Sequence, residues 1–227
     1  MKNRELVKAV IFDLGGTIIK SAEPAQIFHR ILEAHRIHVQ TEKIRTAHRK
    51  NETEHDPEDM AQQGIEYWNR WNMTLLKTIG IDENRELLAR RINEQWFDYA
   101  DLQVFPDAAQ TLRELKRRRV KLGVVTNALA EEIEKMFEKL NLNNIFDVAV
   151  GCDACKKAKP SREIFCYALD RLKVRPENAV FVGDSIKYDY EGAKEAGMKT
   201  VLISRDGDAP VGVESVTNLN EILKYID

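Results

Sequence analysis

The sequence predicts an α/β fold, a doubly wound parallel sheet into which an all-helical domain is inserted. Short apolar runs of strand length alternate with amphipathic helical segments at the N-terminus and again in the second half of the chain. Strands and helices that alternate in this way pair in parallel through right-handed crossovers, which produces an open sheet covered by helices. Residues 18–101 contain helical patterns and no convincing strand. We therefore expect an α/β core of residues 1–17 and 102–227, with residues 18–101 as an inserted helical domain.

The first expected strand runs from Leu6 to Asp13. It is rich in branched apolar residues and ends in a carboxylate that is followed by Gly15 and Gly16, as a buried strand that stops at a tight loop would be. Similar runs predict further strands at Val120–Asn127, Asn178–Ser185 and Lys199–Ser204, with a weaker one at Phe146–Gly151.

Two helices are expected between these strands. Pro106–Arg119 begins with a proline in its first turn and ends in four basic residues, which suit a helix C-terminus. Pro160–Leu172 places its apolar residues on one helical face. The inserted region predicts roughly four more helices, at Pro24–Ile37, Glu42–Asn51, Pro57–Ile79 and Glu83–Tyr99. It holds all 3 tryptophans and all 5 histidines, and the aromatic residues are expected to form its core.

The composition excludes several classes of protein. With 43% hydrophobic and 32% charged residues in 227, the chain is folded rather than disordered. A net charge of -2 gives no basic field for nucleic acid. No apolar run approaches the ~20 residues of a membrane span, and the start does not resemble a secretion signal. The three cysteines Cys152, Cys155 and Cys166 are an odd number, which fits a reducing compartment. We therefore expect a cytoplasmic protein.

The expected strands end in residues that suit phosphoryl chemistry. In an open parallel sheet, ligands bind at the carboxyl ends of the strands, where the strand order reverses. The residues at those ends include carboxylates, a hydroxyl, an amide and, just before a helix, a lysine: Asp13, Thr126, Asn127, Lys159, Asp184 and Asp189. A carboxylate can attack phosphorus, and Mg²⁺ held by other carboxylates can neutralise the charge that develops.

Four segments in this order resemble the motifs of the haloacid dehalogenase-like (HAD) superfamily. They are FDLGGT, VVTN, the Lys159-Pro160 pair and GDSIKYDYEGAKEAGM. The resemblance extends from about Val7 to Ser204, and the helical insertion after the first motif resembles the type-1 cap of that superfamily. The implied fold is a Rossmann-like core with an all-helical cap domain.

The resemblance implies a role for each matching residue. Asp13 would be the nucleophile that forms an aspartyl-phosphate, while Thr126 and Lys159 would hold the phosphoryl group. Gly16, Thr17 and Asn127 would contact the substrate, a small phosphorylated metabolite. Mg²⁺ would be bound by Asp13, the backbone carbonyl of Gly15, Asp184 and Asp189. The resemblance does not define the oligomeric state, and we expect a monomer or a homodimer.

Gly15 departs from the pattern of the phosphatases in this superfamily. These usually carry an aspartate there, which protonates the leaving group, and such acid-base catalysis contributes about 10²–10⁴ in rate. A cap residue such as His29 or a water could replace it, or the substrate could have a good leaving group. Alternatives are a metal-free 2-haloacid dehalogenase, a phosphonate hydrolase using a cap lysine, and a catalytically weak protein that binds phosphorylated metabolites. The candidate lysines are Lys20, Lys43, Lys50 and Lys77.

Cys152 and Cys155 form a single CxxC pair close to Lys159. The chain has no second pair to complete a metal site. Their position next to the expected site leads to a hypothesis that oxidation inhibits the protein.

Overall fold

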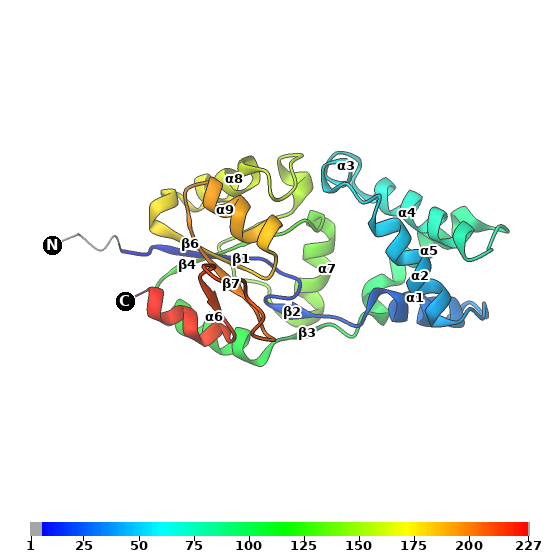
Figure 1. Cartoon of the computed structure of the whole chain (residues 1–227), viewed down its shortest axis with the longest axis horizontal. Coiled ribbons are helices and arrows are strands. Elements are labelled where there is room, and N and C mark those ends of the chain that lie inside the picture. The colour runs from blue at the N-terminus through cyan, green and yellow to red at the C-terminus, as the bar shows by residue number, and fades with distance from the viewer. Residues whose placement is uncertain (1–5, 227) are drawn as a thin grey trace. The chain divides into compact units, whose positions relative to one another are not determined.

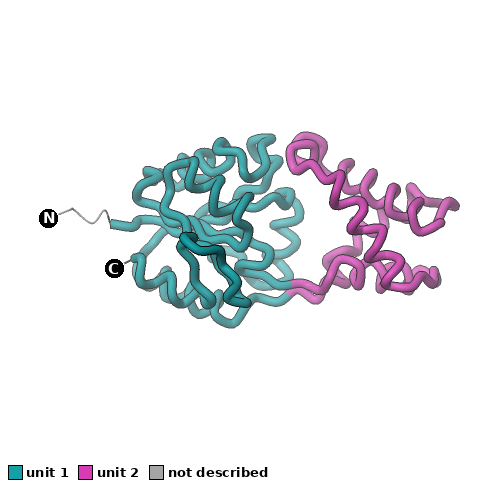
Figure 2. The backbone as a smooth tube through the Cα atoms, in the orientation of Figure 1, with its two compact units in different colours: residues 1–20, 103–227 teal, residues 21–102 magenta. Residues whose placement is uncertain are grey.

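The computed structural model describes residues 6–226, which fold into two compact units. One contains the chain up to Lys20 and again from Gln103 onward, and the other is Ser21–Leu102 (Figure 2). These boundaries differ slightly from residues 18 and 101 because the chain on both sides of the helical unit is paired. Strand β2 (Ile19–Lys20) lies antiparallel to β3 (Gln103–Val104), so these residues belong to the α/β unit. Two-residue strands show no sequence periodicity, which explains why β2 was not expected.

Six parallel strands form the main sheet within residues 6–226. Their order across the sheet is β5 (Val148–Val150), β4 (Lys121–Val125), β1 (Ala9–Phe12), β6 (Ala179–Gly183), β7 (Lys199–Ile203) and β8 (Ser215–Val216). The five expected strands are therefore confirmed, and β8 is an additional edge strand. The strand order reverses at β1, which has β4 on one side and β6 on the other. All residues of β1 and β6 are buried, as their continuous apolar sequences predict.

Helices cover both faces of this sheet. They are α6 (Pro106–Arg117), α7 (Ala130–Leu140), α8 (Arg162–Leu172) and α9 (Gly192–Glu195), with a π-helical turn at Ile186–Glu191 and 3₁₀ turns at Cys152–Ala154, Pro176–Asn178 and Leu219–Tyr225. Figure 1 shows α8 and α9 on one side of the sheet and α6 on the other. This arrangement confirms the doubly wound α/β fold. Helix α7, which the sequence analysis did not identify, buries Ile133, Met136 and Phe137.

The second unit is entirely helical. Within residues 21–102 it contains α1 (Pro24–Ala34), α2 (Thr41–Glu52), α3 (Pro57–Gln63), α4 (Ile65–Thr78) and α5 (Arg85–Tyr99). The expected helix Pro57–Ile79 was wrong as one continuous helix, because Gly64 adopts φ +59° and separates α3 from α4. Five helices therefore replace the expected four.

The aromatic residues of this unit lie in two places. Trp96 packs edge-on against the buried Phe28, with ring centroids 6.1 Å apart, so it belongs to the apolar core as expected. Trp68 and Trp71 instead surround His55, whose ring centroid lies 6.3 Å and 5.6 Å from theirs. No helix within residues 6–226 combines the length and the apolar character needed to cross a membrane.

Candidate active site

The site lies where the central strands end. Asp13 directly follows β1, at the reversal of strand order, and Asp184 directly follows the neighbouring β6. Thr126 and Asn127 follow β4 on the other side of β1. Backbone pairing continues to these positions, since the amide of Asp13 donates to the carbonyl of Val182 over 2.9 Å. The parallel sheet thus brings together residues that are more than a hundred positions apart in the sequence.

Lys159 joins two carboxylates at the centre of the site. Its Nζ lies 2.5 Å from Oδ1 of Asp13 and 2.6 Å from Oδ1 of Asp189. The three side chains are 4%, 9% and 2% exposed, respectively. In such a setting the ions interact much more strongly than at a surface, and both carboxylates are held in defined orientations.

Burial shifts the protonation of these groups. Burial and the neighbouring Asp189 and Asp184 raise the pKa of Asp13 to about 7, although Lys159 acts in the opposite direction. Burial and Asp189 also raise the pKa of Asp184. Burial favours the neutral form of Lys159, but Asp13 and Asp189 outweigh it and raise the pKa of the ammonium. The site therefore holds more acidic groups than its lysine balances.

The acidic residues fit a divalent cation. Asp13, Asp184 and Asp189 each offer one carboxylate oxygen, and these oxygens lie within 4.8 Å of one another. Oxygen ligands of this type are those that Mg²⁺ prefers, and a cation would counter the repulsion among the acids, which together with burial raises the pKa values of Asp13 and Asp184.

Main-chain contacts fix the lysine and the most deeply buried acid. The carboxamide of Asn127 accepts from the Lys159 amide over 2.7 Å and donates to the Lys159 carbonyl over 3.2 Å. Asn127 was expected to contact the substrate, but these bonds leave it one free N–H for that purpose. Oδ2 of Asp189 accepts from the Ser185 amide over 2.9 Å.

The hydroxyl oxygen of Thr126 accepts from the Ala128 amide over 3.3 Å, and its own proton can still be donated.

The loop after β1 approaches the acidic residues closely. Gly16 adopts φ +73°, and a Cβ atom there would lie 2.1 Å from Oδ2 of Asp184. Gly15, in contrast, is exposed, and a Cβ atom on it would meet nothing within 4 Å. Thr17 is completely buried, and its Oγ1 has no hydrogen-bond partner among residues 6–226. The structure thus places Gly16 beside the acids, leaves space at Gly15 and directs Thr17 into the interior.

Arg205 is a residue of this region that the sequence analysis missed. It lies two positions after β7, and its guanidinium donates to the carbonyls of Gly16 and Thr17 and to Asp107. The signal in the sequence is its position just past the end of a parallel strand, at the edge where Asp13, Thr126 and Asp184 also lie.

The CxxC cysteines differ in their surroundings. Cys152 is fully buried and donates its thiol to the carbonyl of Asn127 over 3.2 Å. Burial raises the pKa of this thiol to about 12, and the nearby Asp153 acts in the same direction. A thiol that stays protonated is a poor nucleophile, so the structure does not favour oxidation at Cys152. Cys155 is partly exposed.

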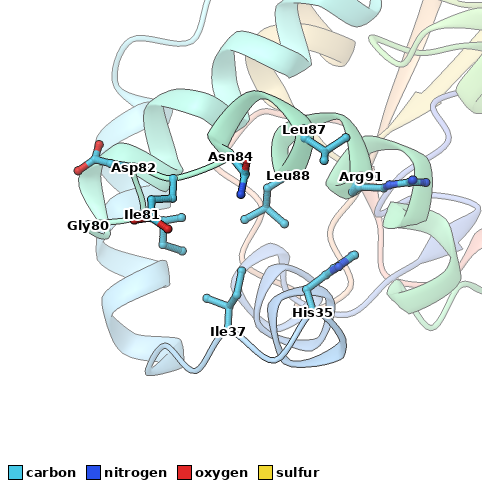
Figure 3. A pocket seen from close by; sticks show the side chains of 10 residues that line it. His35, Ile37, Gly80, Ile81, Asp82, Asn84, Leu87, Leu88 and Arg91 are labelled. Atoms are coloured by element: carbon cyan, nitrogen blue, oxygen red, sulfur yellow. The ribbon is translucent and has the colours of Figure 1, made fainter.

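The helical unit contains a hollow of about 720 Å³. Figure 3 shows His35 and Ile37 on one side of it, and Leu87, Leu88 and Arg91 of α5 on the other. The hollow shares no residue with the acidic cluster.

Comparison with known proteins gives matches over most of the chain. Residues 10–203 match the family described as haloacid dehalogenase-like hydrolase. Glyceraldehyde 3-phosphate phosphatase of Methanopyrus kandleri is 32% identical over 203 residues, covering 88% of this chain and 85% of that protein. (S)-2-haloacid dehalogenase 4A of Burkholderia cepacia is 26% identical over 208 residues, with 90% and 86% covered. The crystal structure of a 2-haloacid dehalogenase from Pseudomonas syringae pv. Tomato DC3000 is similar at a TM-score of 0.73 and 26% identity, with 97% and 98% covered.

Proposed function

The chain belongs to the haloacid dehalogenase-like hydrolase family and is an enzyme, and from this premise we propose that it is a Mg²⁺-dependent phosphohydrolase. Its substrate would be a small phosphomonoester, and the reaction would pass through an aspartyl-phosphate on Asp13. The similarity to a relative named as a phosphatase supports the reaction class. The α/β unit would carry the chemistry, and residues 18–101 would act as a cap.

One observation carries the proposal, namely the convergence of Asp13, Asp184 and Asp189 around a common space, with Lys159 bonded to two of them. A metal-free displacement of halide has no need for three acids within reach of one cation. Phosphoryl transfer gives the acids a purpose, because they would hold a cation that neutralises the negative charge developing on the phosphoryl oxygens. Mg²⁺, when bound, would supply part of that neutralisation and orient the phosphoryl group.

The chain's own residues would then act in two steps. A carboxylate oxygen of Asp13 attacks phosphorus, and the bond between phosphorus and the leaving oxygen breaks. Lys159 and the hydroxyl of Thr126 donate hydrogen bonds to the phosphoryl oxygens during this step. Water then attacks the phosphorus of the aspartyl-phosphate, which releases inorganic phosphate and restores Asp13. Closure of a cap would exclude other water during the first step.

The leaving oxygen must take up a proton, and Gly15 has none to give. Within the helical unit, Nδ1 of His29 donates to the carbonyl of Val39 over 2.9 Å, so a proton for the leaving group would have to be carried by Nε2. A water or a substrate with a good leaving group would serve equally. The space around Gly15 indicates that an aspartate at that position could be accommodated.

The 2-haloacid dehalogenase reaction is the second candidate, since two of the similar proteins carry that name.

The phosphonate hydrolase alternative has less support. Lys20, Lys43, Lys50 and Lys77 are all exposed, and Lys43 donates to the carbonyl of Ile79 over 2.7 Å. A lysine that forms a Schiff base needs a desolvated setting that lowers its pKa.

The decisive experiment is phosphate release from p-nitrophenyl phosphate and from a panel of alkyl phosphates, with Mg²⁺ and with chelator. The aryl ester tests the nucleophile and the metal separately from the missing acid, because aryl leaving groups depart with little protonation. Release that needs Mg²⁺ and disappears in Asp13→Asn supports the proposal. Gly15→Asp should accelerate alkyl esters more than the aryl ester if the missing acid limits the rate. Absence of release from every ester would contradict the phosphatase, and chloride release from 2-chloropropionate would then identify the dehalogenase.

A further inference from the structure

Arg205 binds the loop that follows the nucleophile through two successive carbonyls. Its Nη2 lies 2.8 Å from the carbonyl oxygen of Thr17, and its Nε lies 3.3 Å from that of Gly16. A planar guanidinium can donate to two acceptors in fixed directions, so it sets the orientation of both peptide groups. This loop, residues 14–18, joins Asp13 to β2.

The guanidinium is itself held in place from two sides. Its central carbon lies 3.5 Å from the ring centroid of Phe105, and its Nη1 lies 3.0 Å from Oδ2 of Asp107. Asp107 also accepts from the amide of Leu219 over 2.8 Å. Arg205 is 24% exposed and Asp107 is 8% exposed, so much of this network is shielded from water. A group fixed in this way loses little conformational entropy when it orients a loop.

Phe105, which packs against the guanidinium, also bonds to the loop directly, at the carbonyl that follows those of Gly16 and Thr17. The amide of Phe105 donates to the carbonyl of Ile18 over 3.0 Å. Three consecutive carbonyls, those of Gly16, Thr17 and Ile18, are therefore bonded to Arg205 and Phe105.

The same loop also lies against one residue of the acidic cluster. Gly16 approaches Asp184 so closely that a Cβ atom would overlap with its carboxylate. The backbone at Gly16 therefore contacts both the guanidinium of Arg205, through its carbonyl, and the carboxylate of Asp184. Asp13 directly precedes the loop, and Asp184 lies against Gly16 within it. A shift of the loop would therefore alter the spacing between these two acids.

We propose that Arg205 is a positioning residue that fixes the loop after Asp13 in the geometry that the reaction requires. This inference rests on the proposed phosphohydrolase function. It assigns Arg205 no contact with the substrate. Misplacement of reacting groups by about 1 Å can cost ~10² in rate, so loss of the forked contact should reduce turnover without unfolding the protein.

Arg205→Lys tests the proposal, because lysine keeps the charge beside Asp107 but lacks the planar fork. Arg118→Lys is the matched control, since Arg118 is 27% exposed and pairs with Glu114 in the same unit. Each variant is compared with the unaltered protein in thermal unfolding, in hydrolysis of p-nitrophenyl phosphate with Mg²⁺, and in amide hydrogen exchange of a peptide spanning residues 14–19.

For Arg205→Lys we expect faster exchange in the 14–19 peptide and a kcat that falls at least ~10-fold, with KM changed less than kcat and the melting temperature close to that of Arg118→Lys. If Arg205→Lys does not fold, Asp107→Asn replaces it, because it removes the charged partner of the guanidinium while Arg205 itself remains. Faster exchange in that variant, with reduced kcat, supports the proposal equally.

Unchanged exchange at residues 14–19, or faster exchange with an unchanged kcat, would overturn it. If the unaltered protein hydrolyses no ester, the proposed function fails, whereas the exchange comparison still decides whether Arg205 holds the loop.

Discussion

The ammonium of Lys159 lies 2.5 Å from a carboxylate oxygen of Asp13, and both side chains are buried. Lys159 reaches this position from the segment before α8, where Asn127 holds its main chain on both sides. The contact joins two motifs separated by 146 residues in the sequence. It places a fixed positive charge beside the proposed nucleophile, where the transferred phosphoryl group would also lie.

Replacement of this lysine should therefore remove most activity. We expect Lys159→Met to lower kcat for p-nitrophenyl phosphate by about 10²–10³, the usual cost of removing a preorganised donor from a transition state. Lys135→Met, which removes a partly exposed lysine paired with Glu131, is the control and should retain activity. Equal rates for the two variants would show that Lys159 has no part in the reaction.

Substitution by alanine should lower the stability of the protein at Gly16 and leave it nearly unchanged at Gly15. Gly16→Ala places a Cβ atom on the carboxylate of Asp184 and forces alanine to φ +73°, a backbone conformation that costs L-residues about 1–2 kcal/mol. Gly15→Ala meets open space. We expect urea unfolding to show a clear loss of stability for Gly16→Ala, together with loss of activity, and little change in stability for Gly15→Ala. Similar stabilities for both variants would contradict the close approach of Gly16 to Asp184.

The sequence predicted β1, β4, β6 and β7 because each is an apolar run that the sheet buries on both faces, and it gave only a weaker signal for β5, which lies at the edge with Ala149 exposed. It also predicted where Asp13, Thr126 and Asp184 meet, since parallel strands end at a common edge. It did not predict β2, β3 and β8, because two residues are too few to show a period. The contacts of Arg205 escaped prediction for a different reason. They are made to backbone carbonyls, which every residue carries, so only the folded chain shows which carbonyls it reaches.

The cysteines provide a test of the oxidation hypothesis. Because Cys152 is fully buried and its pKa is raised to about 12 by burial, we expect it to resist iodoacetamide at pH 7 in the folded protein. Cys155 and Cys166 are partly exposed and should be modified first, as mass spectrometry of peptides would show. Mild oxidant should leave hydrolysis unchanged in the protein and in Cys152→Ser alike. Rapid labelling of Cys152 in the native state would contradict its burial and restore the redox hypothesis.

The ion pair between Asp107 and Arg205 should make stability depend on pH in the acid range. Burial alone would raise the pKa of Asp107, but hydrogen bonds from the Leu219 amide and from Arg205 outweigh it, and the pKa lies below its ordinary value. A carboxyl group with a lowered folded-state pKa contributes its full stability above the unfolded value of about 3.9, and that contribution is lost as the pH falls through the folded-state pKa. Asp107→Asn keeps the shape of the side chain and removes the charge.

We therefore expect Asp107→Asn to be less stable than the unaltered protein by about 1–3 kcal/mol at pH 7, the range for a hydrogen bond to a charged group. This difference should stay constant from pH 8 to about pH 5 and shrink as the pH falls below about 4, because the unaltered protein alone loses the charge at position 107. Urea unfolding at pH 7, 5, 4 and 3 measures it directly. The matched variant Asp208→Asn changes a carboxylate in an exposed loop after β7, and its difference from the unaltered protein should stay small at every pH. A difference for Asp107→Asn that persists unchanged at pH 3 would show that the carboxylate charge does not stabilise the fold, and that Arg205 is held by Phe105 and the loop carbonyls alone.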